Sequence, residues 1–67
     1  LTDGLFLTVV AYRDLGLVYQ AYDALARVED QGPLSPDLYL LMGEILTDMG
    51  QGEAAREAFD KANELAR

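Results

Sequence analysis

The strongest constraint in this sequence is a pattern that returns after 34 residues. Asp14-Leu15-Gly16 reappears as Asp48-Met49-Gly50, and the alignment extends in both directions without a gap. The matched positions include the pairs Asp3/Asp37, Leu7/Leu41, Ala21/Ala55 and Ala24/Ala58. A repeat of this length with helical patterning is typical of α-solenoids, in which each repeat is one helical hairpin.

The sequence predicts two helices in each copy. The first helix is expected over residues 3–15, with Thr2 as a candidate N-cap and Gly16 as the left-handed residue that ends it. The second is expected over residues 17–30, and Gly32-Pro33 stops it. Its apolar residues follow helical spacing and are expected in the core: Leu17, Val18, Ala21, Ala24, Leu25 and Val28.

The second copy has a clear helix start at Ser35-Pro36-Asp37, which combines a capping hydroxyl, a proline in the first turn and an acid. Its helices are expected over residues 36–48 and 52–66. The last helix has one apolar and one charged face, and the charged face offers the i,i+4 pairs Arg56–Asp60 and Glu57–Lys61. Short turns at Gly16 and at residues 50–52 predict two antiparallel hairpins in one domain.

These residues resemble the tetratricopeptide repeat (TPR), whose pattern is W-x2-L-G-x2-Y followed by A-x3-F. In residues 36–67 the matching positions are Tyr39, Met42-Gly43, Leu46, Ala55, Phe59 and Ala62. Residues 2–35 keep the same frame with Leu5, Thr8-Val9, Tyr12, Ala21, Leu25, Val28 and Pro33. The resemblance implies an all-α fold: four helices in two hairpins, stacked as a short right-handed TPR-like α-solenoid. Val9 replaces the family's glycine, so we expect looser packing in the first repeat.

The resemblance also implies a concave groove lined by the first helix of each repeat. The groove-facing residues would be Asp3, Phe6, Val10, Arg13, Asp14, Asp37, Leu40, Glu44, Thr47 and Asp48. This set is apolar and acidic, so it favours a basic or amphipathic peptide or helix of a partner protein. It lacks the Lys and Asn clamp with which some TPR domains hold a C-terminal carboxylate. The alternative is that the acids only keep the surface solvated.

The first repeat has more apolar surface than two repeats can cover. From Leu5 to Tyr12 only Thr8 is polar, and Tyr19 and Tyr22 lie outside the core stripe of the second helix. A helix that is apolar on most sides is usually buried on most sides. We therefore expect an assembly surface for an upstream repeat, another subunit or a second copy, formed by Leu5, Phe6, Val9, Val10, Tyr19 and Tyr22.

Composition restricts the chemistry. The 67 residues include no Cys and no His, so disulfides, Cys/His metal sites and His-based catalysis are excluded. We expect no catalytic residue, cofactor or bound metal. The net charge of −7 disfavours nucleic acid and anionic membranes, and no apolar run could span a bilayer. The compartment is not readable, although a soluble, cytoplasmic location is favoured.

The leading functional interpretation is a non-catalytic scaffold that binds a partner protein in the groove. The alternative is an assembly module, which self-associates or joins a larger repeat array. The chain starts at Leu1 without Met, so it could also be a fragment that serves as an accessory domain of an enzyme.

Overall fold

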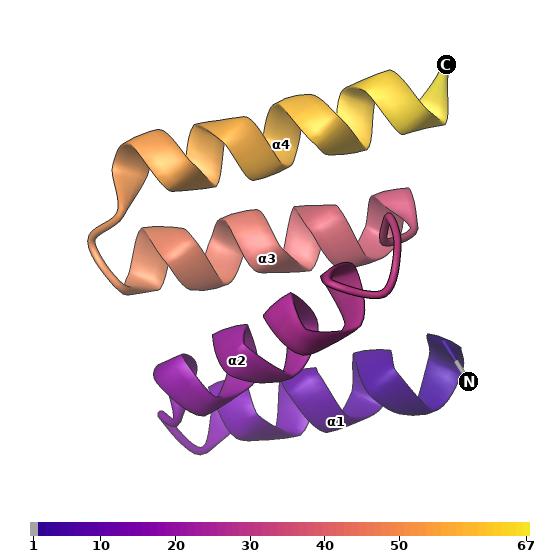
Figure 1. The fold of residues 1–67 in the computed structure, drawn as a ribbon. Coiled ribbons are helices and arrows are strands. Elements are labelled where there is room, and N and C mark those ends of the chain that lie inside the picture. The colour runs from indigo at the N-terminus through magenta and orange to yellow at the C-terminus, as the bar shows by residue number, and fades with distance from the viewer. Residues whose placement is uncertain (1) are drawn as a thin grey trace.

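The computed structural model describes residues 2–67, and the side chains of residues 4–67. It contains four α-helices, α1 (Thr2–Asp14), α2 (Val18–Glu29), α3 (Pro36–Asp48) and α4 (Gly52–Ala66), and no strand within the described residues (Figure 1). The predicted all-α, four-helix architecture is therefore confirmed. The N-cap role expected for Thr2 concerns a side chain outside the described part of the chain.

The sequence repeat corresponds to a repeated turn. Gly16 and Gly50 both adopt left-handed conformations, with φ of 80° and 78°. Leu17 N–H donates to the Tyr12 carbonyl at 2.9 Å in the first turn, and Gln51 N–H donates to the Leu46 carbonyl at 2.8 Å in the second. Each glycine N–H also donates to the carbonyl three residues earlier, which completes a Schellman motif. Two identical helix ends therefore lie 34 positions apart.

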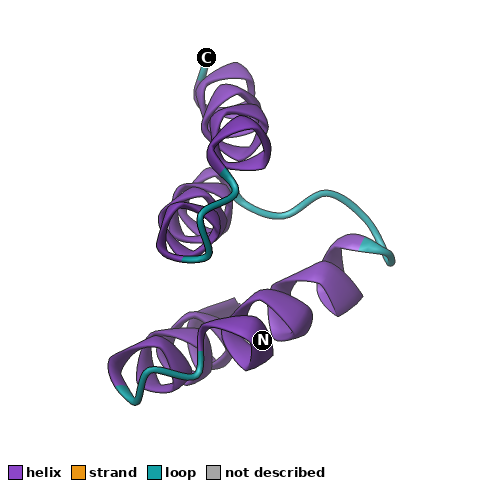
Figure 2. Ribbon diagram, turned by 90° about the vertical axis from the view of Figure 1, so that its left-hand side faces the viewer, coloured by secondary structure: helices purple, strands orange, loops and turns teal. Residues whose placement is uncertain are grey.

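The helices form two antiparallel hairpins, α1–α2 and α3–α4, which contact each other mainly through α2 and α3 (Figure 1). The loop between α2 and α3 carries the chain from one hairpin to the other (Figure 2). Ser35 occupies the N-cap position of α3, but its hydroxyl makes no capping hydrogen bond, contrary to expectation. Pro36, whose fixed φ suits the first helical turn, begins the helix.

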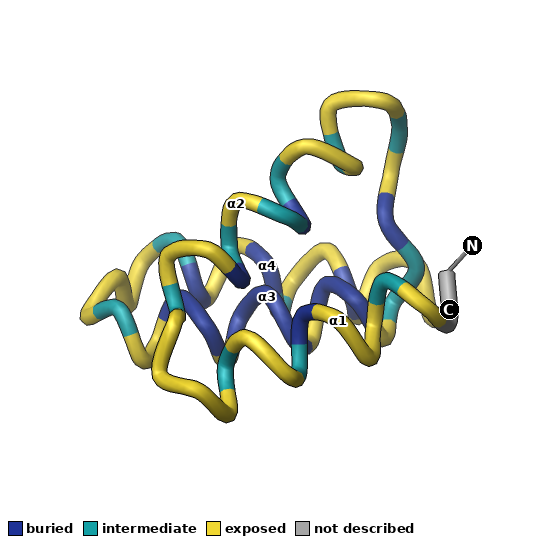
Figure 3. Tube along the Cα trace, turned by 90° about the horizontal axis from the view of Figure 1, so that it is seen from below, coloured by how far each residue is buried: buried dark blue, intermediate teal, exposed yellow. Residues whose placement is uncertain are grey.

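The hydrophobic core is concentrated in the second hairpin (Figure 3). The first hairpin contributes three buried residues, Val9, Ala21 and Leu25. The second contributes Leu38, Tyr39, Leu41, Met42, Ile45, Leu46, Ala55, Ala58 and Ala62, and Leu34 is buried in the loop. Two residues expected in the core stripe of the second helix, Leu17 and Val28, are instead exposed, at 38% and 40%.

Close packing of α3 and α4 depends on Gly43. A Cβ atom at this position would lie 2.5–2.7 Å from three ring atoms of Phe59. The absence of a side chain therefore lets the aromatic ring lie directly on α3. At the equivalent position of α1, Val9 is fully buried.

Candidate functional site

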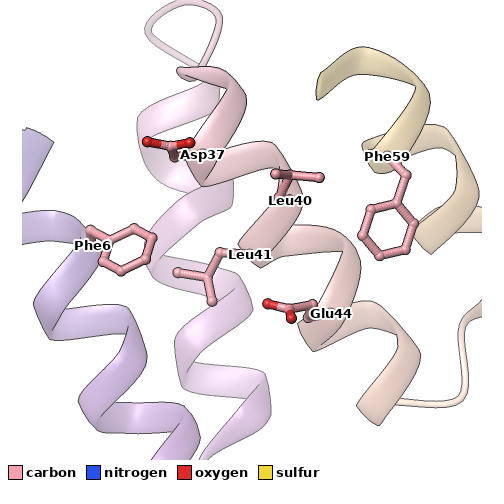
Figure 4. A pocket seen from close by; sticks show the side chains of 6 residues that line it. All are labelled: Phe6, Asp37, Leu40, Leu41, Glu44 and Phe59. Carbon is pink, nitrogen blue, oxygen red and sulfur yellow. The ribbon is translucent and has the colours of Figure 1, made fainter. Parts of the chain in front are cut away.

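An open depression with a volume of about 420 Å³ lies where α1, α3 and α4 meet. Its lining combines four apolar and two acidic residues: Phe6, Asp37, Leu40, Leu41, Glu44 and Phe59 (Figure 4). The wall from α1 is Phe6, the floor and rim come from α3, and Phe59 closes the side toward α4. The depression is thus an apolar hollow with carboxylates at its rim.

Helical spacing places the α3 residues of this site. Asp37, Leu40 and Glu44 follow at i, i+3 and i+7, which puts them on one face of the helix. The opposite side of α3 carries buried residues such as Leu38, Leu46 and Ile45, which fix the rotation of the helix. Leu40 is 45% exposed, so a large apolar side chain is presented to solvent at the centre of the site.

An ion-pair cluster lies beside the depression, near the C-terminal ends of α1 and α3. The Arg13 Nε of α1 donates to Asp48 Oδ2 of α3 at 2.8 Å, and its Nη1 lies 3.7 Å from Glu44 Oε2. The hydrogen bond to Asp48 raises the pKa of Arg13 above its ordinary value; burial opposes this rise, and the charges of Asp48, Glu44 and Asp14 add to it. The guanidinium therefore stays charged and links the two hairpins. Asp37 forms no ion pair with any described residue, so the cluster leaves an excess of negative charge along α3.

The predicted groove residues divide into three groups. Phe6, Asp37, Leu40 and Glu44 line the depression, and Arg13 and Asp48 join Glu44 beside it. The remaining residues contribute less: Val10 packs half-buried against the core, Asp14 is exposed outside the depression, and the Thr47 hydroxyl donates to the Gly43 carbonyl at 2.9 Å. The side chain predicted at Asp3 lies outside the described residues.

The predicted assembly residues do not form one exposed surface. Val9 is fully buried and is corrected to a core residue, because it belongs to the hydrophobic core cluster. Leu5, Val10 and Tyr22 are half-buried against the core, Phe6 belongs to the depression, and Tyr19 is exposed on α2. Among the large apolar residues of the α1–α2 hairpin, the most exposed are instead Leu7 at 68%, Leu15 at 73% and Tyr19 at 67%.

Two lining residues were not predicted for the site, Leu41 and Phe59. Both fit the repeat pattern as core residues, and Leu41 is buried while still bordering the depression. The sequence feature that could have indicated a role for Phe59 is Gly43. A glycine in the middle of α3 allows an aromatic ring from α4 to lie across the helix. Phe59 is accordingly half-buried rather than enclosed.

On α2, α3 and α4, a second polar cluster joins the hairpins. The Tyr39 hydroxyl donates to Glu29 Oε2 at 2.8 Å, and the Lys61 ammonium donates to the same oxygen at 3.2 Å. Lys61 therefore pairs with Glu29 of α2, and the expected Glu57–Lys61 pair is replaced by a contact between elements.

Within the described residues, no group of three or more His, Cys, Asp or Glu residues is placed to hold a metal ion. None of the four helices is long and apolar enough to cross a bilayer. No protein-family model, curated protein or solved structure matches this chain.

Proposed function

We propose that this chain is a non-catalytic protein-interaction scaffold that binds a basic, amphipathic peptide or helix of a partner protein. The observation that carries this proposal is the depression lined by Phe6, Leu40 and Phe59 with Asp37 and Glu44 beside them. Apolar side chains of the partner would enter the hollow, and its cations would meet the carboxylates. The chain would thus act by recognition alone.

The internal ion pairs support the choice of a cationic partner. Arg13 already occupies part of the acidic surface, where it is held by Asp48 and Glu44. Asp48 and Glu44 thus already bind one guanidinium group, that of Arg13. Asp37 and the exposed part of Glu44 remain accessible to a second cation. A net charge of −7 also speeds the approach of a basic partner.

We also assign the hairpins to a TPR-like, right-handed α-solenoid arrangement. The support comes from the two Schellman turns 34 positions apart and from the small residues Ala21 and Ala55 buried at equivalent positions. In such an arrangement α1 and α3, the first helices of the two repeats, carry the binding surface. The depression and the Arg13 cluster are built mainly from these two helices.

Selection from a library of random peptides tests the proposal. We expect bound peptides to be enriched in Lys or Arg together with Leu, Ile or Phe. The double variant Asp37→Asn/Glu44→Gln should lower their affinity by roughly tenfold, because two rim carboxylates are lost. The control Glu53→Gln/Glu57→Gln changes the net charge equally, from −7 to −5, on the exposed side of α4. Equal losses in both variants, or no enrichment of basic residues, would contradict a groove site.

A further inference from the structure

The two carboxylates at the rim of the depression are seven residues apart on α3. Asp37 and Glu44 therefore lie on the same face of the helix, about 10.5 Å apart along its axis. Leu40 lies between them along the helix, and Phe6 and Phe59 flank α3 on opposite sides (Figure 4). One helix thus presents an acid, an apolar side chain and a second acid in a row.

Both rim carboxylates can accept a cation from outside the chain. Asp37 forms no ion pair with any described residue. Glu44 lies 3.7 Å from the Arg13 guanidinium, and its side chain is 53% exposed. Asp48, in contrast, already accepts a hydrogen bond of 2.8 Å from Arg13. A complementary partner therefore carries two cations, for Asp37 and Glu44, with an apolar group between them.

The spacing of these groups distinguishes a helical partner from an extended one. An extended chain rises about 3.3 Å per residue, and only side chains an even number of residues apart point to the same side. Its cations would lie about 6.6 or about 13.2 Å apart, which does not match the rim carboxylates. In a helix, residues seven positions apart return to the same face after about 10.5 Å. A helix therefore matches both carboxylates at once.

We propose that the partner segment is an α-helix that lies antiparallel to α3, with cations at i and i+7 and an apolar residue at i+4. This inference rests on the proposed function and specifies the partner of the same site. Leu40 is three residues from Asp37 and four from Glu44. In the antiparallel helix the cation at i meets Glu44, the residue at i+4 meets Leu40, and the cation at i+7 meets Asp37. A parallel helix would need its apolar residue at i+3 instead.

The helix dipole favours the antiparallel direction. Glu44 lies toward the C-terminal end of α3, which ends at Asp48 and carries partial negative charge on its last carbonyl groups. Arg13 supplies one positive charge to these two carboxylates, so this end of the site stays negative. An antiparallel partner brings its positive N-terminal end here, whereas a parallel partner would bring its negative C-terminal end.

Two helical peptides of identical composition test the direction. Each has about 15 residues on an alanine background, with arginines at i and i+7. The single leucine stands at i+4 in one peptide and at i+3 in the other. Fluorescence anisotropy should show that the i+4 peptide binds at least about fivefold more tightly, because only its leucine reaches the hollow beside Leu40. Equal affinities, or tighter binding of the i+3 peptide, would overturn the assigned direction.

Double-mutant cycles identify which acid meets which cation. Replacing the arginine at i+7 with glutamine should weaken binding to the wild type but have little further effect on Asp37→Asn. Replacing the arginine at i should likewise have little further effect on Glu44→Gln. The opposite pairing would indicate a parallel helix and overturn the proposal. Glu53→Gln, which removes an exposed carboxylate of α4, is the control and should couple to neither arginine.

The helix propensity of the peptide tests its bound conformation. Replacing two outward-facing alanines with glycine removes no contact but disfavours the helix, so it should weaken binding roughly tenfold. Unchanged affinity would show an extended partner and overturn the proposal. If peptides selected from the random library bind but fail these tests, only this inference fails. If no basic, apolar peptide binds at all, the proposed function fails with it.

Discussion

The hydroxyl of Tyr39 donates a 2.8 Å hydrogen bond to the carboxylate of Glu29 and thereby connects α3 with the end of α2. Lys61 of α4 donates to the same carboxylate oxygen and lies 5.5 Å from the centre of the Tyr39 ring. The hydrogen bond from Tyr39 lowers the pKa of Glu29, and Lys61 adds to this. The pKa of Tyr39 is raised, mainly by burial and to a smaller extent by the hydrogen bond to Glu29. Three helices thus meet at one charged acceptor.

Removing the Tyr39 hydroxyl should destabilise the fold without disturbing its packing. Tyr39 is buried, and a hydrogen bond to a charged acceptor contributes about 1.5–3 kcal/mol. Because Glu29 keeps Lys61 as a partner, we expect Tyr39→Phe to lower the free energy of unfolding by about 1–2 kcal/mol, measured by urea denaturation. Tyr19→Phe, in which the lost hydroxyl is on an exposed residue, is the matched control and should change little. Equal effects of the two changes would show that the bond to Glu29 contributes nothing.

The contribution of the Glu29 charge should depend on pH. The folded pKa of Glu29 lies below the ordinary value of 4.5, so its ionised form stabilises the fold fully above 4.5. This stability is lost as the pH falls through the lower, folded value. We expect Glu29→Gln to reduce the free energy of unfolding by up to about 1 kcal/mol at neutral pH, and by progressively less as the pH falls through the folded pKa.

The control for this titration is Glu53→Gln, which removes one exposed carboxylate from α4 and so changes the net charge equally. Urea denaturation of the wild type and both variants across the acid range gives the comparison. A difference between wild type and Glu29→Gln that did not shrink as the pH fell below 4.5 through the acid range would show that the carboxylate charge is not the source of the stability.

Gly43→Ala should be destabilising, although alanine is the better helix former. In an open helix position this change stabilises by about 0.8–1 kcal/mol. At Gly43 the added methyl would lie 2.5–2.7 Å from the Phe59 ring, and relieving such overpacking costs about 1–3 kcal/mol. Gly52→Ala, where nothing lies within 4 Å, is the control and should not destabilise. Thermal denaturation should also show that Gly43→Ala destabilises the protein less when Phe59 is replaced by leucine. If Gly43→Ala stabilised the protein instead, α3 and α4 would not be closely packed at this position.

The sequence predicts the helices well because local signals determine where they end. The repeated Asp-x-Gly marks both Schellman turns, and the observed helix bounds differ from the predicted ones by at most one residue. The errors arise where the neighbours of a residue decide its environment. Leu17 and Val28 have core-like spacing but are exposed, and Val9 was placed at a surface but is buried. Helical periodicity identifies a face, whereas burial depends on which elements cover that face.

The candidate site shows the same division between local and long-range information. Spacing along one helix predicts that Asp37, Leu40 and Glu44 share a face, and the depression contains all three. The pairs Arg13–Asp48 and Glu29–Lys61 join residues 35 and 32 positions apart, so only the packing of the hairpins determines them. The Arg56–Asp60 pairing expected within α4 is likewise not among the ion pairs of the described residues.

Replacing Arg13 by alanine should change stability and binding in opposite directions. The pair with Asp48 is partly exposed, so its loss should lower the free energy of unfolding by at most about 1 kcal/mol. The same change frees Asp48 and Glu44 and removes the only base from the groove, which should strengthen binding of basic, groove-selected peptides by roughly fivefold. Fluorescence anisotropy with a labelled peptide measures the affinity, and urea denaturation measures the stability.

The matched control is Arg27→Ala, which also changes the net charge from −7 to −8 and breaks an ion pair, that with Asp23 on α2. Arg27 does not line the depression, so its removal should strengthen binding only through the long-range field, an effect that disappears above about 0.5 M salt. The additional increase in affinity of Arg13→Ala should be less sensitive to salt, because it arises from carboxylates in direct contact with the peptide. If both variants gained the same affinity at every salt concentration, the acids of α3 would not be the binding site.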